Sequence, residues 1–160
     1  MTSQPSLVRL GEADRPALER HFLALEPEDR SLRFGAALGD DGVRAYVERI
    51  DLAKDGVFAI REGDTLAAVM HAAFSGHVAE LGLSVLPGWR LQGLGNRLFD
   101  YAVGFVHGHG TTELFVHCRS DNGAMMHLAR KHRMRIADFG DETDARVGVG
   151  SLTRPATRDP

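Results

Sequence analysis

Cysteine is nearly absent from this sequence, and so are other features that define large classes of protein. Cys118 is the only cysteine among 160 residues, so no disulfide can form within the chain, which fits a reducing compartment. No apolar run approaches the roughly 20 residues that span a bilayer. Residues 1–10 lack the basic and apolar regions of a signal peptide. We therefore expect a cytoplasmic protein with no membrane partner.

An excess of positive charge is also missing. The sequence has 19 Lys and Arg against 22 Asp and Glu, a formal net charge of −3. Nucleic-acid-binding domains usually carry a basic excess or a clustered basic face, so we expect no nucleic-acid partner. Of the residues, 43% are hydrophobic, enough for one globular domain with its own core. We expect that domain over residues 1–152, followed by a flexible tail at residues 153–160.

Hydrophobic periodicity predicts helices and strands whose order changes at mid-chain. The first half reads as a strand, two helices and a meander of three strands joined by tight turns. The predicted ranges are 7–10, 12–25, 43–50, 56–60, 65–74 and 77–86. The second half reads as an amphipathic helix at 93–107, a strand at 112–118, a helix to about 132, and one or two final strands. This order indicates an α/β sheet with mixed strand directions.

A glycine-containing turn opens the long helix, with the sequence Arg90-Leu91-Gln92-Gly93-Leu94-Gly95. The first N–H groups of a helix lack intrahelical partners and carry partial positive charge, so they can bind phosphate oxygens. Missing side chains at Gly93 and Gly95 would let those oxygens approach the backbone. The dinucleotide fingerprint wants a third glycine where Leu98 stands, so it does not fit. The turn alone is also compatible with a helix that simply begins in a glycine-containing loop.

The turn and its neighbours resemble the GNAT superfamily, the acetyl-CoA-dependent N-acetyltransferases. The family's central motif is Arg/Gln-x-x-Gly-x-Gly/Ala between an apolar strand and a long helix, and residues 90–95 match it. Residues 79–87 are similar to the family's fourth strand, and Asn122, Leu128 and Lys131 fall on further family positions. The resemblance implies an α/β (α+β) fold with a mixed, mostly antiparallel sheet. Its fourth and fifth strands splay apart, and helices flank both faces.

The resemblance also assigns roles by position. Acetyl-CoA, or another short acyl-CoA, is expected as co-substrate in the opening between the two splayed strands. The residues expected to contact it are Leu83, Val85, Arg90, Gln92, Gly93, Leu94, Gly95, Asn96 and Asn122. A strand bulge near Leu83-Ser84 is expected to aim one N–H at the thioester carbonyl and stabilise the oxyanion.

Acyl transfer needs a base, because an amine acceptor is protonated at neutral pH. Glu80 is the first candidate, since family members often use a glutamate here through water; the alternative is a structural, paired glutamate. His117 is the second candidate, and its alternative is a packed, hydrogen-bonded histidine. Ser84 would either hydrogen-bond the leaving sulfur or only shape the strand. Where many family members carry a tyrosine as general acid, this chain has Ala129.

The remaining expectations concern metals, partners and activity. No His-Glu-x-x-His motif or cysteine cluster exists, so we expect no metal, and Cys118 is expected to be a buried, inert thiol. Residues 23–38 are expected to form the acceptor side, for an amine-bearing small molecule or a protein lysine or N-terminus. The sequence thus predicts an N-acyltransferase, with a non-catalytic acyl-CoA sensor as the alternative. Since related domains often dimerise, a homodimer stays open.

Overall fold

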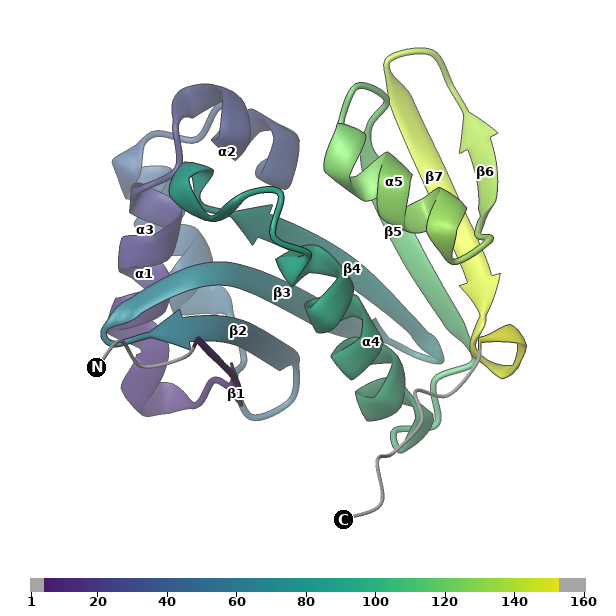
Figure 1. The fold of residues 1–160 in the computed structure, drawn as a ribbon, viewed down its shortest axis with the longest axis horizontal. Helices are drawn as coiled ribbons and strands as arrows, with labels where there is room; N and C mark the ends of the chain where they lie inside the picture. The colour runs from purple at the N-terminus through teal and green to yellow at the C-terminus, as the bar shows by residue number, and fades with distance from the viewer. Residues whose placement is uncertain (1–4, 153–160) are drawn as a thin grey trace.

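The computed structural model describes residues 5–152, and their backbone forms a seven-stranded sheet with helices against both faces (Figure 1). The strand order is β1-β2-β3-β4-β5-β7-β6. Every neighbouring pair is antiparallel except β4 with β5. The expected mixed, mostly antiparallel sheet is confirmed. The tail expected at residues 153–160 lies outside the described residues.

The strands fall close to the ranges predicted from periodicity. Their bounds are β1 Ser6–Arg9, β2 Gly56–Glu62, β3 Thr65–Ser75, β4 Val78–Val85, β5 Glu113–Arg119, β6 Arg135–Asp138 and β7 Glu142–Gly148. Short 3₁₀ turns lie at η1 Glu12–Asp14, η2 Pro87–Trp89 and η3 Val149–Ser151. The C-terminal segment thus forms a hairpin, β6–β7, that adds to the sheet through β7 and leaves β6 at its edge.

The helices include one that the sequence analysis did not predict. Their bounds are α1 Arg15–Leu23, α2 Pro27–Phe34, α3 Asp40–Arg49, α4 Leu94–His107 and α5 Gly123–Lys131. We expected Glu26-Pro27-Glu28-Asp29 only to end the preceding helix. Pro27 is instead the first residue of α2, where its missing N–H costs no hydrogen bond, and Glu28 and Asp29 in the first turn suit the helix dipole.

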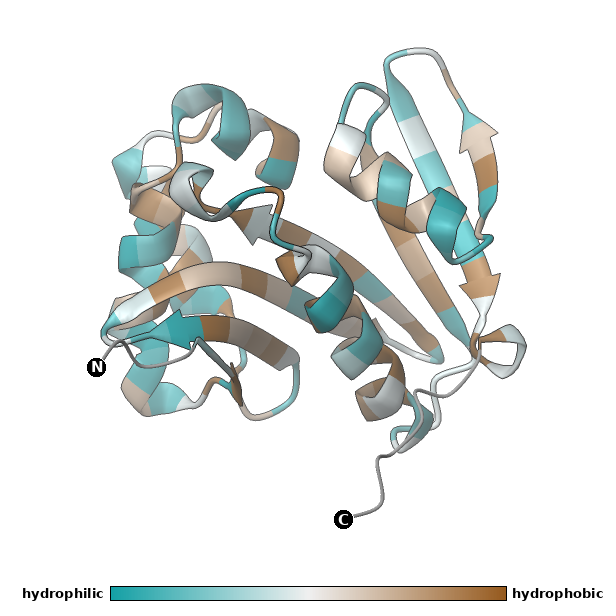
Figure 2. Cartoon of the chain, viewed as in Figure 1, coloured by the Kyte–Doolittle hydropathy of each residue, from teal (hydrophilic) through white to brown (hydrophobic). Residues whose placement is uncertain are grey.

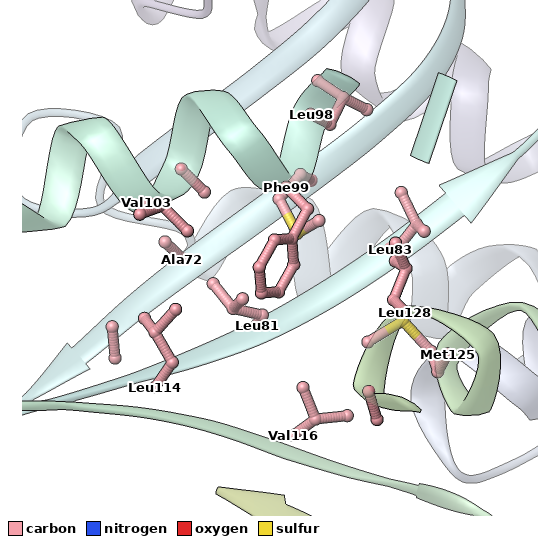
Figure 3. Packing of buried hydrophobic residues seen from close by; sticks show 14 of the residues in the cluster. Ala72, Leu81, Leu83, Leu98, Phe99, Val103, Leu114, Val116, Met125 and Leu128 are labelled. Carbon is pink, nitrogen blue, oxygen red and sulfur yellow. The ribbon is translucent and has the colours of Figure 1, made fainter. Parts of the chain in front are cut away.

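The sheet separates two hydrophobic clusters. On one face α4 and α5 cover the larger cluster, to which Leu81, Leu83 and Phe99 belong, and Figure 3 shows Phe99 near its centre. On the other face α1 and α3 pack Phe22 and Val47 against β2 and β3. Figure 2 shows hydrophobic residues along β2 and β3 and hydrophilic ones over much of α2 and α3. Helix α2 therefore lies at the edge of this second layer, where polar residues remain accessible.

Strands β4 and β5 pair over only a short stretch. Their register has three pairs, Val78 with Glu113, Ala79 with Leu114, and Glu80 with Phe115. Beyond Glu80, β4 pairs only with β3, and beyond Phe115, β5 pairs only with β7. The two strands diverge from there (Figure 1), so the predicted splay is confirmed.

The side of β4 that faces the splay can be read from its hydrogen bonds. The Leu86 amide donates to the Ala67 carbonyl on the β3 side at 2.9 Å. Because successive backbone groups along a strand point in opposite directions, the N–H and C=O groups of Leu83 and Val85 point into the opening. The pairing of β4 with β3 is regular from Val78 to Val85. The bulge expected near Leu83-Ser84 is therefore wrong, and the missing strand partner exposes these groups instead.

Phe99 tests the larger cluster. Its side chain is fully buried and its ring stacks on His132 with the centroids 4.0 Å apart. We expect Phe99→Ala to lower the free energy of unfolding by about 3–5 kcal/mol, because it leaves a cavity among packed side chains. Phe139, 68% exposed, supplies the matched control. Phe139→Ala should change stability by less than about 0.5 kcal/mol in urea denaturation, and equal losses in both variants would contradict the assignment of Phe99 to the core.

Candidate active site

Two cavities open at the splay, and they share part of their walls. The turn cavity, about 600 Å³, lies between the end of β4, the turn before α4 and the start of α5. The α2–α3 cavity, about 320 Å³, lies between these two helices and strands β3, β4 and β5. Leu32, Arg33, Leu83 and Asn122 line both. The splay thus connects two chambers, and these four residues mark the junction between them.

The wall of the turn cavity includes the start of α4. Gly93 precedes the helix in a left-handed conformation, with φ of +75°, which favours glycine. The first helical bond runs from the Arg97 amide to the Gly93 carbonyl, 3.1 Å. Among residues 5–152 no group accepts a hydrogen bond from the amides of residues 94–96. These amides, at the positive end of the helix dipole, can bind an anion.

Gly95 has a different role from Gly93. A Cβ atom at Gly95 would lie 3.0 Å from Cδ2 of Leu83, whereas one at Gly93 would meet nothing within 4 Å. The first turn of α4 therefore approaches β4 closely because Gly95 has no side chain. The two glycines of the motif thus serve backbone conformation at one position and close packing at the other.

The structure brings most of the expected coenzyme residues together. The turn cavity is lined by Leu83, Val85, Arg90, Gly93, Leu94, Gly95, Asn96 and Asn122. Gln92 is exposed and does not line it. Asn122 is buried, and its side-chain oxygen accepts a hydrogen bond of 3.2 Å from the Met125 amide. Its amide side chain therefore holds the start of α5 at the junction of the two cavities.

Arg90 is tied to the unpredicted helix. It forms an ion pair with Asp29 of α2, 2.8 Å, and its Nε and Nη2 each donate to the Val85 carbonyl at 3.3 Å. Asp29 also lines the turn cavity, and sequence reasoning missed it because α2 itself was not predicted. The Asp29 carboxylate therefore already balances part of the Arg90 charge that an anion in this cavity would meet.

Arg33 occupies the junction from the α2 side. Its guanidinium lies over Gly82, where a Cβ atom would be only 2.7 Å from Cζ of Arg33. The rings of Phe22, Phe34 and Tyr46 surround it, with centroids 5.1–5.5 Å from Cζ. No carboxylate among residues 5–152 pairs with it. A positive charge is thus held by aromatic faces at the point where the two cavities meet.

The two candidate bases lie on the same face of the sheet and line the α2–α3 cavity. Glu80 is exposed at the last pair of the β4–β5 ladder. His117 bonds through Nδ1 to Asp144 at 2.5 Å and through Nε2 to Glu142 at 3.3 Å. The hydrogen bond to Asp144, with the charges of Glu142 and Glu80, raises the pKa of His117 above its ordinary value. His117 therefore holds its proton more tightly than a free imidazole, which favours the hydrogen-bonded alternative over the base.

Ser84 lines the turn cavity, but its hydroxyl is bonded to a buried histidine. His21 Nδ1 lies 2.6 Å from the Leu66 carbonyl, and Nε2 lies 2.7 Å from Ser84 Oγ. A carbonyl only accepts, so Nδ1 carries the proton, and in the neutral ring Nε2 accepts from the Ser84 hydroxyl. Burial lowers the pKa of His21 to about 4, which keeps the ring neutral. The Ser84 proton is thus engaged, and the geometry favours a structural role over donation to a leaving sulfur.

Two further positions are accounted for by packing. Ala129, where the family often has a tyrosine, is 1% exposed in the larger hydrophobic cluster and lines neither cavity. Burial raises the pKa of the Cys118 thiol, which keeps it neutral, as expected for an inert cysteine.

Within the described chain no group of three or more His, Cys, Asp or Glu could hold a metal ion. No helix in residues 5–152 is long and apolar enough to cross a membrane.

Comparison with known proteins agrees with this geometry. A sequence model described as the acetyltransferase (GNAT) family matches residues 17–133. No curated protein matches the sequence significantly.

Three solved structures illustrate the shared fold. The GNAT domain of S. lividans PAT has a TM-score of 0.74 at 14% identity, with 89% of each chain covered. The protein yncA from Salmonella typhimurium, solved with acetyl-CoA, has a TM-score of 0.68 at 16% identity, covering 98% of this chain and 99% of that one. A spermidine N-acetyltransferase from Vibrio cholerae, in complex with CoA and spermine, has a TM-score of 0.70 at 14% identity, covering 92% and 97%.

The buried histidine makes stability depend on pH. The folded pKa of His21, about 4, lies below the unfolded value of about 6.5, so the unfolded chain binds the extra proton between these values. The stability that the neutral His21 ring contributes is therefore fully present above pH 6.5 and is lost as pH falls toward 4. Between pH 7 and pH 5 the wild type should lose about 2 kcal/mol more than His21→Gln in urea unfolding. Parallel losses in the two proteins would contradict a neutral, buried His21.

Proposed function

Because the chain belongs to the acetyltransferase (GNAT) family, we propose that it transfers an acetyl or other short acyl group directly from acyl-CoA to a primary amine. The observation that carries the proposal is the junction of two cavities at the β4–β5 splay. One cavity has free helix amides suited to a diphosphate. The other is lined by ionisable side chains suited to an amine and its protons.

In this proposal the coenzyme occupies the turn cavity. Its pyrophosphate accepts hydrogen bonds from the amides of residues 94–96, and its pantetheine arm runs along the exposed edge of β4. The N–H groups of Leu83 and Val85 then donate hydrogen bonds to the arm, as they would to a neighbouring strand, while the Val85 carbonyl keeps its bond to Arg90. The thioester carbonyl lies at the junction, where the Leu83 N–H stabilises the oxyanion of the tetrahedral intermediate.

The amine enters through the α2–α3 cavity. Glu80 takes a proton from the ammonium group through water, the amine nitrogen attacks the thioester carbon, and the C–S bond breaks to release CoA. A small-molecule amine or a protein lysine or N-terminus fits this chemistry. The Vibrio cholerae relative, whose structure contains spermine, supports an amine acceptor of this class.

A second candidate function is a sensor that binds acyl-CoA without turnover. The burial of Ala129 in the hydrophobic cluster favours it, because the family's usual acid has no place there. Release of CoA can be measured against a panel of small amines and peptides. Turnover with any amine supports the transferase, whereas tight binding of acyl-CoA with no turnover supports the sensor.

Gly93 tests the coenzyme site. We expect Gly93→Glu to weaken CoA binding about 100-fold in isothermal titration calorimetry, because a carboxylate would stand where a phosphate binds and roughly 3 kcal/mol would be lost. Gly63→Glu is the matched control, since Gly63 also has a positive φ, of +59°, in the β2–β3 turn. This control carries the same backbone strain away from the cavity and should bind CoA normally. Unchanged affinity in folded Gly93→Glu would sink the proposal.

Glu80 tests the base. We expect Glu80→Gln to lower kcat about 100-fold at neutral and low pH, within the range for loss of a general base. The deficit should shrink as pH rises, because more of the free amine is then deprotonated in solution. Glu113→Gln, on β5 but paired with Arg146, is the control and should keep wild-type kcat. A pH–rate profile of Glu80→Gln that matches the wild type would rule out this role.

A further inference from the structure

A chain of four polar side chains runs from the loop before β2 to the junction of the cavities. Asp55 Oδ2 lies 2.9 Å from His71 Nε2, and His71 Nδ1 lies 3.2 Å from the Tyr46 hydroxyl. The Tyr46 hydroxyl in turn lies 3.0 Å from Arg33 Nη2. Tyr46, His71 and Arg33 line the α2–α3 cavity, and Arg33 also lines the turn cavity. The Tyr46 oxygen is therefore one hydrogen bond from the junction.

The direction of each hydrogen bond follows from donors and acceptors. Arg33 can only donate, so the Tyr46 oxygen accepts from it. The Asp55 carboxylate accepts from His71 Nε2–H, which leaves Nδ1 of the neutral ring as an acceptor, and Tyr46 O–H donates to it. Burial is the main cause that lowers the pKa of His71, and the Arg33 charge adds to it. The neutral ring required by this pattern is thus the favoured form.

This pattern prepares Tyr46 to exchange protons. The hydrogen bond to His71 Nδ1 orients the Tyr46 hydroxyl, whose proton can pass to an acceptor in the α2–α3 cavity. The phenolate left behind would face the Arg33 guanidinium, which has no carboxylate partner within the described chain. The side chains of His71 and Asp55 are only 10% and 16% exposed, so water screens these interactions weakly.

We infer that Tyr46 is a catalytic residue of the proposed transfer, carrying a proton from the attacking nitrogen to the departing sulfur, with His71 and Asp55 as positioning residues. The inference rests on the proposed function and assigns Tyr46 the role that a tyrosine at position 129 would otherwise fill.

The proton inventory of the reaction is complete with this assignment. The ammonium group loses its first proton to Glu80, and the free amine forms the C–N bond, which leaves a second, acidic proton on nitrogen. The Tyr46 oxygen takes that proton as its own hydroxyl proton passes to the sulfur. When the C–S bond breaks, its electron pair stays on sulfur and takes the proton that Tyr46 donates, so Tyr46 ends as a neutral phenol and His71 stays neutral throughout. The products are the amide, CoA thiol and one proton released from Glu80.

The sequence offers a matched pair for the test, because the chain has only two tyrosines. Tyr101 lies on α4, is 43% exposed and lines neither cavity. We expect Tyr46→Phe to lower kcat about 100-fold, within the range for loss of a positioned acid–base group, with CoA affinity unchanged. Tyr101→Phe should stay within about twofold of the wild type. Turnover by Tyr46→Phe within about threefold of the wild type would overturn the inference.

A second measurement separates proton transfer from structure. In the Tyr101→Phe background Tyr46 is the sole tyrosine, so biosynthetic replacement of tyrosine by 3,5-difluorotyrosine alters this residue alone and lowers its phenol pKa at almost unchanged size. The basic limb of the kcat–pH profile should then move to lower pH. The other titratable and charged groups that line the α2–α3 cavity with Tyr46 or bond to His71 are unaltered by the substitution, namely Arg33, Asp55, His71, Glu80, His117, Arg119 and Glu142. A profile that does not move would overturn the inference, and this measurement does not depend on whether Tyr46→Phe folds.

The outcomes distinguish this inference from the proposed function. A wild-type protein that binds CoA but releases none with any amine refutes the transferase itself. A wild-type protein that turns over, together with an equally active Tyr46→Phe, refutes only the role of Tyr46. His71→Gln adds a check on the positioning role, because it should lower kcat about tenfold while leaving the KM for the amine unchanged.

Discussion

The interruption of the β4–β5 ladder after three residue pairs is the constraint on which the rest of the structure depends. A continuous ladder would satisfy the backbone groups of Leu83 and Val85 and close the sheet at its centre. Because the ladder stops at Glu80, these groups have no strand partner, and the cavities on the two sheet faces meet at the gap. The turn before α4 and the polar side chains under α2 and α3 then meet at one point, although they lie on different faces.

The alternation of side chains along β4 keeps the two chambers chemically distinct. Leu81 and Leu83 point toward α4 and α5 and belong to the hydrophobic cluster. Glu80, Gly82 and Ser84 point to the other face, as the two-residue period of a strand requires. One face of β4 therefore packs against the first turn of α4, and the other gives the acceptor cavity a polar wall. A one-residue slip in the register of β4 would exchange these two faces.

The polar groups near the splay are held by partners that come from distant segments. Arg90 is joined to Asp29, and His21 to Ser84. Buried polar groups without such partners would cost stability, so the arrangement of helices α1–α3 is coupled to the geometry of β4. The substrate side and the coenzyme side are consequently parts of one packed unit, and Arg33 contacts both.

The sequence by itself determined the local features: the strand periodicity, the long helix, the glycine turn that opens it, and through the resemblance the splay. These depend on spacings of a few residues, which hydrophobic period and helix-end chemistry encode directly. The sequence did not reveal α2, because a proline such as Pro27 is equally compatible with the end of one helix and with the first turn of the next. Only the tertiary structure decided that Arg33, Tyr46, Asp55 and His71 meet, since residues this far apart are brought together by packing, and no short-range pattern records it.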